Sequence, residues 1–238
     1  LRIHKDNILN TKVAEVSYYY DSYLLGFKVR KQKYNLISGI EVFSKLIEEF
    51  ESVFFIVKNI VGDNLEFIKH IENDEKRKNQ FIIDNAFYIF FNGITFYEKN
   101  LDRLSKQDVH DKKFIDKRLA EIFIKEFNVI KQLYNKYGNS GLKKISKKNN
   151  FDFDYEYEPF CGHLDILSHY FRHLFQICKY VVKQNENFLS YEQKREYLRI
   201  LRSNMSTYEQ LLLYYNWLGF GVKWEEKLED EHIGKIYN

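Results

Sequence analysis

Proline occurs once and glycine ten times among the 238 residues of this chain. Sandwiches and barrels of short strands need frequent turns, and turns depend on these two residues. Hydrophobic residues make up 45% of the chain, which is enough for a substantial core. The sequence therefore predicts an all-α (mostly α) fold. We expect one helical domain over residues 1–238, made of long packed helices, with a short irregular or extended segment near 139–160.

Charge and cysteine content exclude little about binding partners but indicate the compartment. Lys and Arg number 37 and Asp and Glu number 34, so the weakly basic balance decides nothing about nucleic acid. Cys161 and Cys178 are too few for a disulfide framework, which favours a reducing cytosol. No apolar run approaches the roughly 20 residues that span a bilayer. A membrane anchor ahead of Leu1 would lie outside this sequence.

Apolar residues recur at steps of three and four in several stretches, which is typical of amphipathic helices. We expect a break in the first helix at Gly62 to Asn64 and a glycine cap at Gly138. The apolar run 81–97 also permits a strand. The predicted helices are residues 34–71, 81–97, 114–137, 164–184 and 190–218.

Other stretches have weaker patterns. Residues 6–25 have roughly helical spacing, although three successive tyrosines, Tyr18 to Tyr20, also permit a strand. We interpret residues 26–33 as a basic connection, 73–79 as a charged link and 99–113 as a polar loop.

Residues 139–158 form the clearest internal boundary. Lys143 to Asn150 is basic, and Phe151 to Glu158 alternates aromatic and acidic residues until Pro159 ends the run. Strict alternation predicts a short strand or an extended segment. Its partner is the preceding basic stretch or another molecule. The alternative is a loop that packs its aromatic rings on the helices.

Polar side chains form a stripe on each of the last two predicted helices, beside an apolar face. The first stripe is His169, Arg172, His173 and Gln176, and the second is Arg202, Ser206, Glu209 and Asn216. Helices joined by a short link usually pack antiparallel, so we expect the stripes to face each other. Burying such groups is costly unless each is paired.

Three interpretations of these stripes stay open. The first is a structural ion-pair network in which Arg172 or Arg202 pairs with Glu209 and fixes the helix register. The second is a functional pocket that grips an anion or cleaves a phosphodiester, and the third is solvent exposure. In the functional case the candidate catalytic residues are His169, Arg172, Arg202 and Glu209. The candidate ligand-binding residues are His173, Ser206 and Asn216.

Metal and cofactor motifs are missing from the sequence. Potential ligands crowd between Cys161 and His173, and His169 and His173 stand one helical turn apart. However, no Glu follows the first His as in zinc proteases, and no second Cys pair completes a structural zinc site. No phosphate-binding glycine loop, nucleophile elbow or dinucleotide fingerprint occurs. We therefore expect no metal and no cofactor.

The C-terminal segments are similar to a known family. His169 to Phe175 reads His-Tyr-Phe-Arg-His-Leu-Phe, and Arg202 to Ser206 leads to Glu209 and then to Tyr215-Asn216. These motifs resemble the AbiC-like abortive-infection family, in which a His-Tyr-Phe-Arg helix precedes an Arg-x-x-Leu-Ser-x-x-Glu helix ending in Tyr-Asn. Met205 stands where that family usually has Leu. Upstream, Phe50 to Phe55 resembles the family's Phe-Glu-x-x-Phe-Phe segment.

The resemblance implies a bacterial antiphage protein, an effector or sensor that arrests or kills the infected cell. It implies a bacterial cytoplasmic location or an inner-membrane anchor ahead of Leu1. Candidate partners are a phage-derived trigger, another defence protein, RNA, the membrane and a second copy in a homo-oligomer. A metal-independent HEPN-like RNase is one alternative function, although Arg172 and His173 are adjacent rather than spaced as in HEPN domains. A membrane-linked scaffold is the other.

Overall fold

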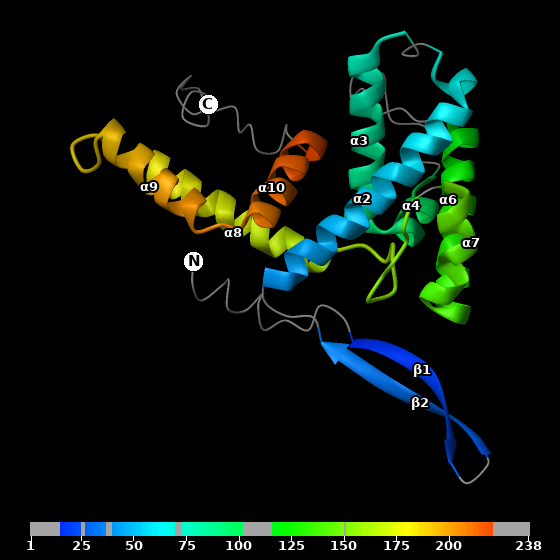
Figure 1. Cartoon of the computed structure of the whole chain (residues 1–238). Coiled ribbons are helices and arrows are strands. Elements are labelled where there is room, and N and C mark those ends of the chain that lie inside the picture. Colours follow the sequence, from blue (N-terminus) through cyan, green and yellow to red (C-terminus); the bar gives the residue numbers. More distant parts are fainter. Residues whose placement is uncertain are drawn as a thin grey trace. The chain divides into compact units, whose positions relative to one another are not determined.

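The computed structural model describes residues 15–24, 27–36, 40–69, 73–101, 116–149 and 151–220 (Figure 1). Helices dominate these ranges, so the predicted mostly α fold is confirmed, and a two-stranded hairpin is added to it. In chain order the elements are β1 (Glu15–Leu24), β2 (Phe27–Leu36), α2 (Ile40–Asp63), the 3-10 helix η1 (Leu65–Ile68), α3 (Glu75–Asn92), α4 (Ile94–Lys99), α6 (Lys117–Tyr137), α7 (Asn139–Asn149), α8 (Leu164–Val182), α9 (Tyr191–Ser203) and α10 (Thr207–Phe220).

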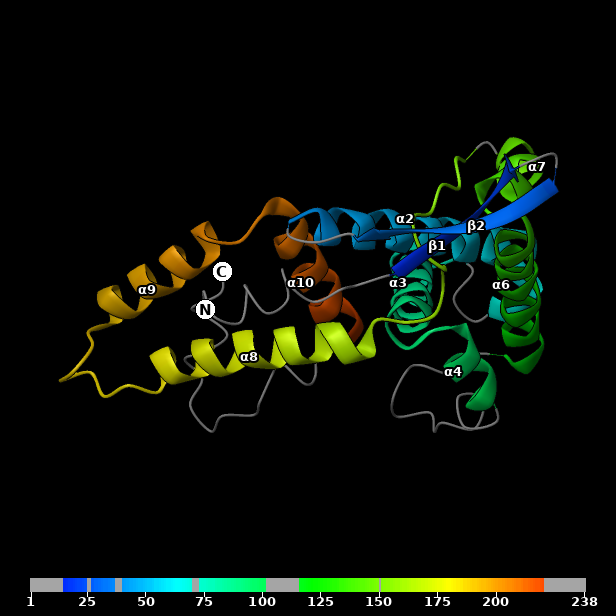
Figure 2. The same cartoon turned by 90° about the horizontal axis from the view of Figure 1, so that it is seen from below.

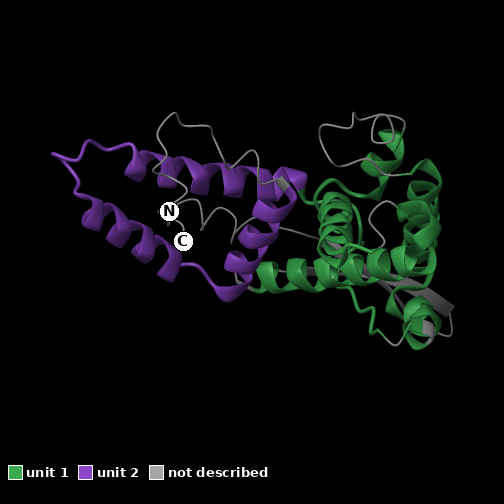
Figure 3. Cartoon of the chain, turned by 90° about the horizontal axis from the view of Figure 1, so that it is seen from above, with its two compact units in different colours: residues 1–163 green, residues 164–238 purple. Residues whose placement is uncertain are grey.

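The chain divides into two compact units, residues 1–163 and residues 164–238 (Figure 3). The first unit, unit 1, contains the hairpin and helices α2 to α7. The second, unit 2, contains α8, α9 and α10. The division falls just after the irregular segment expected near 139–160. The prediction that residues 1–238 fold as one domain stays a prediction.

Over residues 15–24 and 27–33, a hairpin replaces the helix and the basic connection that we considered for residues 6–33, and residues 6–14 lie outside the described residues. β1 and β2 pair antiparallel, with Glu15 opposite Leu36 and Leu24 opposite Phe27. Strand β1 contains four tyrosines, a residue that suits pleated strands, and Asp21 of β1 lies opposite Arg30 of β2. The strand alternative for Tyr18 to Tyr20 is thus confirmed, and the interpretation of residues 27–33 as a connection is wrong.

The long helix α2 is the centre of unit 1. It ends at Asp63, inside the break predicted at Gly62 to Asn64. It packs along α3 and also contacts α6. Phe50 on α2 is 1% exposed, and its ring lies edge-on to Phe87 at 5.9 Å and to Phe90 at 5.5 Å between centroids. Edge-to-face geometry of this kind stabilises aromatic cores.

Helix α3 starts earlier than the sequence indicated. The Asp74 carboxylate accepts a hydrogen bond from the Arg77 backbone at 3.0 Å, so residues 75–79 form the first turns of the helix rather than a link. The apolar run 81–97 is helical, as predicted, but is interrupted at Gly93.

Two glycines allow the backbone after α3 to touch the chain ahead of α8. Gly93 has φ 84° and Gly162 has φ 89°. A Cβ on Gly93 would lie 2.3 Å from the Cys161 carbonyl oxygen, and one on Gly162 would lie 2.5 Å from the Asn92 carbonyl carbon. Only glycine fits such a crossing. The two backbones are hydrogen-bonded here, because the His163 N–H donates to the Phe91 oxygen at 2.9 Å.

Helices α6 and α7 differ in how well the sequence predicted them. Gly138 ends α6 with φ 60° and donates its N–H to the Tyr134 oxygen at 2.7 Å, as expected for a glycine cap. Residues 139–149, which we included in the irregular segment, form α7 instead. Leu142, which is fully buried, fixes this helix against its surroundings, and α7 contacts α6.

Residues 151–163 form the irregular segment itself. The aromatic residues Phe153, Tyr155 and Tyr157 are buried, whereas Asp152 and Asp154 are exposed. The alternation therefore marks an extended segment that packs its rings on the helices of unit 1. Its acidic residues pair with lysines outside the basic stretch: Glu156 lies 3.0 Å from Lys45 and Glu158 lies 3.2 Å from Lys131.

The described residues of unit 2, 164–220, form three helices that outline a triangle when seen from below (Figure 2). α8 ends at Val182, close to the predicted end, and contacts α9. The small core between them contains Leu174, Cys178, Leu201 and Met205. The predicted single helix over 190–218 is wrong, because it is divided into α9 and α10 at residues 204–206.

Candidate functional site

The break between α9 and α10 is made by local hydrogen bonds. Asn204 closes α9 by donating its side-chain amide to the Ile200 oxygen at 2.7 Å. Ser206 then begins α10. Its N–H donates to Glu209 Oε2 at 2.7 Å, and its hydroxyl accepts the Glu209 N–H at 3.2 Å. This reciprocal arrangement is a capping box. The motif Ser-Thr-Tyr-Glu was readable in the sequence, but we did not predict this capping box from it.

Glu209 also connects α10 to α8. The Tyr170 hydroxyl donates to Glu209 Oε1 at 2.8 Å. Glu209 is 1% exposed and Tyr170 is 8% exposed, so the bond lies away from solvent. Burial raises the pKa of the Tyr170 hydroxyl, and the neighbouring Glu209 carboxylate raises it further. The tyrosine therefore stays protonated and remains a donor. We refer to this contact of Tyr170, Ser206 and Glu209 as the Tyr–Glu latch.

The predicted meeting of arginine and glutamate is wrong. Arg172 and Arg202 are exposed, and within the described residues neither guanidinium forms an ion pair or hydrogen bond. The helix break explains this, because Arg202 belongs to α9 and Glu209 to α10, so the two no longer share a stripe. His169 is also exposed. Of the four candidate catalytic residues, only Glu209 is buried.

The candidate ligand-binding residues are similarly divided. Ser206 is half-buried and serves as the cap of α10, His173 is half-buried on α8, and Asn216 is 5% exposed on α10. Among the residues that the structure describes, no three His, Cys, Asp or Glu side chains are placed to hold a metal ion. Arg103 and His110 have six residues between them, which fits the spacing of HEPN domains, but this segment lies outside the described residues.

A second buried carboxylate, in unit 1, was not predicted from the sequence. Glu49 on α2 is 1% exposed and lies 2.8 Å from His163 Nε2 through its Oε2. Its Oε1 accepts the Phe160 N–H at 2.7 Å. Phe160 has φ 63°, a conformation that costs energy for a side chain other than glycine. The carboxylate compensates for this strain by binding the backbone N–H.

The electrostatics of Glu49 indicate a structural role. Burial alone would raise the pKa of the Glu49 carboxyl, but the His163 ring and hydrogen bonds from Tyr157 and the Phe160 backbone hold the pKa below its ordinary value. Burial raises the pKa of Tyr157 well above its ordinary value. A His–Glu pair is a familiar general-base arrangement. Here both side chains are buried, and the pair fastens the chain just ahead of α8 to α2.

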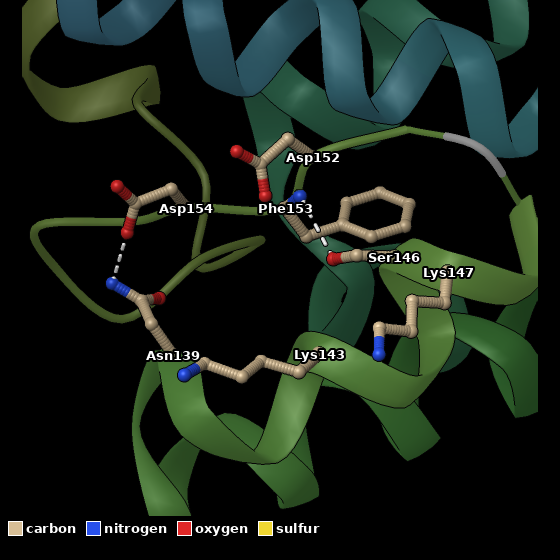
Figure 4. Close-up of a pocket in the computed structure, with 7 residues that line it drawn as sticks. All are labelled: Asn139, Lys143, Ser146, Lys147, Asp152, Phe153 and Asp154. Carbon is tan, nitrogen blue, oxygen red and sulfur yellow. Dashed lines mark hydrogen bonds between the residues drawn. The ribbon is translucent and has the colours of Figure 1, made fainter.

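An open pocket of about 360 Å³ lies where α7 meets the irregular segment (Figure 4). Ser146 accepts the Phe153 N–H at 3.1 Å, and the Asn139 amide donates to Asp154. The lining is Asn139, Lys143, Ser146, Lys147, Asp152, Phe153 and Asp154. Lys143 and Lys147 come from α7, and Asp152 and Asp154 come from the irregular segment across the opening, so the pocket has no single charge that would select a ligand.

Comparison with known proteins identifies the segment that contains the Tyr–Glu latch. Residues 162–228 match the model of a family described as "Putative phage abortive infection protein". This match confirms the AbiC-like resemblance over that segment, and it supports a role in phage abortive infection. No curated protein and no solved structure matches the chain. In the described part of the chain, no helix is long and apolar enough to cross a bilayer.

The structure gives the motifs of the resemblance a physical meaning. The tyrosine of His-Tyr-Phe-Arg is Tyr170, and the Ser-x-x-Glu motif is Ser206 to Glu209. The first donates a hydrogen bond to the second across the helices. The two most specific motifs of the segment therefore form one contact within unit 2.

Proposed function

We propose that this chain is an antiphage defence protein of the abortive-infection type, an effector or sensor that arrests or kills the infected cell. We further propose that the Tyr–Glu latch is its switch. The observation that supports the switch is the buried bond between Tyr170 and Glu209, because it joins the two motifs that carry the family resemblance. The abortive-infection role itself is supported by the family match.

The architecture of unit 2 suits a two-state element. Its core cluster of Leu174, Cys178, Leu201 and Met205 belongs to α8, α9 and the turn that follows α9. Helix α10 adds Leu212, which is fully buried, and Leu213, which packs against the cluster, so a change in packing has to move these two leucines. Glu209 binds both the first turn of its own helix and a side chain of α8. Releasing the tyrosine leaves the capping box intact, so α10 can leave α8 without unfolding.

A trigger acts on such an element by binding one arrangement more tightly than the other. His169 and Arg172 are exposed beside Tyr170 in the sequence, and Arg202 is exposed near the end of α9. These polar side chains are within reach of a phage-derived trigger or another defence protein. In this proposal they recognise the partner, and the buried pair responds.

The test replaces only the hydroxyl of the latch. Tyr170→Phe removes one buried hydrogen bond, at a cost of about 1 kcal/mol, which favours the released state about fivefold. We expect uninfected bacteria that express this variant to grow more slowly than bacteria with the unchanged protein. Tyr208→Phe is the matched control. Tyr208 lies exposed on α10, next to Glu209 in the sequence, and its hydroxyl makes no hydrogen bond within the described residues.

Two measurements separate the outcomes. Phage plating reports defence, and growth without phage reports the switch. If Tyr170→Phe leaves both growth and plating unchanged while lowering the unfolding midpoint, the contact is structural and the switch is rejected. If the unchanged protein does not reduce plating of any of a panel of phages, the abortive-infection function is rejected.

A further inference from the structure

The outward face of α8 has a charge pattern that differs from the rest of the chain. The whole chain has nearly equal numbers of basic and acidic residues, 37 and 34. Between Ile166 and Asn185, however, no Asp or Glu occurs. The outward face carries His169, Arg172, Gln176, Lys179, Tyr180 and Lys183.

Helical spacing aligns the cations of this face, which we call the α8 basic face. Arg172, Gln176, Lys179 and Lys183 are separated by four, three and four residues, so they follow one side of the helix. Lys183 is the first residue after α8, and its N–H still donates to the Lys179 oxygen at 3.0 Å. The row extends about 16 Å at 1.5 Å per residue. Arg172 and Lys183 make no ion pair within the described residues. Their charges are therefore not neutralised by those parts of the protein.

An aromatic side chain stands beside the cations. Tyr180 is 70% exposed, the second-highest exposure among the large hydrophobic residues described. Lys179 Nζ lies 5.8 Å from the centroid of the Phe175 ring, which shows that cations and rings already approach each other on this helix. A row of cations with an exposed ring beside it is the arrangement by which proteins hold single-stranded nucleic acid, since phosphates meet the cations and bases stack on the ring.

The opposite face of α8 argues against a membrane surface. Leu167 is 1% exposed, Leu174 is 3% exposed and Cys178 is 7% exposed, so the apolar side of the helix is already buried in the protein. A helix that lies in a bilayer interface needs that side free to insert. The face that is available offers charge and one tyrosine, which suits a polyanion.

We propose that the α8 basic face binds single-stranded nucleic acid without sequence preference, through Arg172, Lys179 and Lys183 on the phosphates and Tyr180 on a base. This activity goes beyond the proposed switch: it shares Arg172 with the surface proposed to recognise the trigger, but it does not involve the bond between Tyr170 and Glu209. It requires no cleavage of the strand. The purified chain can therefore fail to bind nucleic acid while the defence function is confirmed, and it can bind nucleic acid while the defence function is rejected.

The test measures binding of the purified chain to a labelled oligouridylate of about 20 nucleotides, longer than the roughly 4–16 nucleotides that one small domain covers. Arg172→Gln combined with Lys183→Gln removes two exposed charges. We expect at least a tenfold loss of affinity at low salt. We also expect the slope of log K against log salt to fall by about 1.4, because each single-strand phosphate contact contributes roughly 0.7. Tyr180→Ala should weaken binding about tenfold and leave the slope unchanged.

The neighbouring helix supplies a control of equal charge. Arg195→Gln combined with Arg199→Gln removes two exposed arginines from α9, where Glu192 and Glu196 interrupt the basic residues. Arg199 already lies 3.5 Å from Glu196. We expect this variant to bind almost like the unchanged protein. Circular dichroism verifies that all variants are folded.

Each outcome decides the proposal. Loss in the α8 double variant with retention in the α9 double variant supports it, and an oligothymidylate tested in parallel shows whether RNA and DNA are bound alike. If both double variants lose the same affinity, net charge alone explains the binding and the proposed site is overturned. If the chain binds neither the oligouridylate nor the oligothymidylate, the proposal is also overturned. Binding to phosphatidylserine vesicles but not to oligonucleotides would assign the face to a membrane and reject nucleic acid.

Discussion

Among the described residues, each unit buries one glutamate, and the two carboxylates make similar hydrogen bonds. Glu49 and Glu209 are both 1% exposed. Each accepts a backbone N–H at 2.7 Å, from Phe160 and Ser206 respectively. Each also meets a side chain at 2.8 Å, which is His163 in unit 1 and Tyr170 in unit 2, and Glu49 has Tyr157 as a further side-chain partner. Similar bonds therefore serve two sites whose surroundings differ.

The difference lies in what each carboxylate connects. Glu49 binds chain segments 111 and 114 residues away and is enclosed by an aromatic core. Glu209 binds the turn three residues before it and a tyrosine 39 residues before it. Breaking the first pair therefore separates distant parts of unit 1, whereas breaking the second releases one helix contact. The Glu49 site therefore suits a fixed structural contact, and the Glu209 site suits the switch that we propose.

The strongest test of this contrast removes both carboxylates in turn. Glu49→Ala leaves the His163 ring and the Phe160 N–H buried without a partner, and we expect it to lower the free energy of unfolding by about 3–5 kcal/mol. Glu209→Ala loses a cap and one hydrogen bond, and we expect a loss of about 2 kcal/mol. Chemical denaturation of the whole chain gives both values. An equal loss from the two substitutions would remove the distinction between the sites.

The glycine crossing should be the next most sensitive point of unit 1. Gly162→Ala places a Cβ 2.5 Å from backbone atoms of Asn92 and Gly93, and it requires alanine at φ 89°. We expect a loss of about 2–4 kcal/mol from strain and displacement. Gly62→Ala is the control, because no atom lies within 4 Å of its added Cβ. The control should stabilise α2 slightly, since alanine favours helices. A Gly162→Ala variant as stable as the unchanged protein would show that the crossing is loose.

Acid should affect the Glu49 site in a predictable direction. The pKa of Glu49 in the folded chain lies below its ordinary value of 4.5, so its contribution is complete above pH 4.5 and is lost as the pH falls through the folded pKa. We expect Glu49→Gln to flatten the fall of unfolding free energy below pH 4.5. The exposed Glu51 on the same helix provides a control, and Glu51→Gln should leave the slope unchanged. A slope that persists in Glu49→Gln would assign the acid sensitivity to other groups.

Local patterns in the sequence predicted the parts of the fold that depend on local interactions. Helical spacing gave α2, α6 and α8, and Gly138 gave the end of α6. The missed break at Ser206 was also local, and its Ser-x-x-Glu motif was present to be read. Glu49 could not be found in this way. Glu49 lies in a helix of ordinary composition. Its role depends on Phe160 and His163, which lie more than 100 residues away in the sequence and come close to it only in the folded chain.

The same physical limit applies to the predicted site. The prediction that Arg202 and Glu209 share one face assumed a continuous helix over residues 190–218. The break between α9 and α10 places the two residues in different helices. Tyr170 was quoted for the family resemblance but received no role, because a tyrosine on an apolar face looks like core. Only the three-dimensional contact shows that its hydroxyl has a buried acceptor.

The smallest expected effect compares two buried tyrosines by the same change. The Tyr155 hydroxyl in unit 1 is buried and has no hydrogen-bond partner among the described residues. Its polar neighbour Ser52 donates its own hydroxyl to the Glu48 oxygen at 2.9 Å. Tyr155→Phe should therefore change the unfolding free energy by less than about 1 kcal/mol, or raise it, because an unpartnered buried polar group is costly. Tyr170→Phe should lower it by about 1 kcal/mol. If Tyr155→Phe were the more damaging of the two, its hydroxyl would have a partner such as bound water, and unit 1 would hold a second polar site beside Glu49.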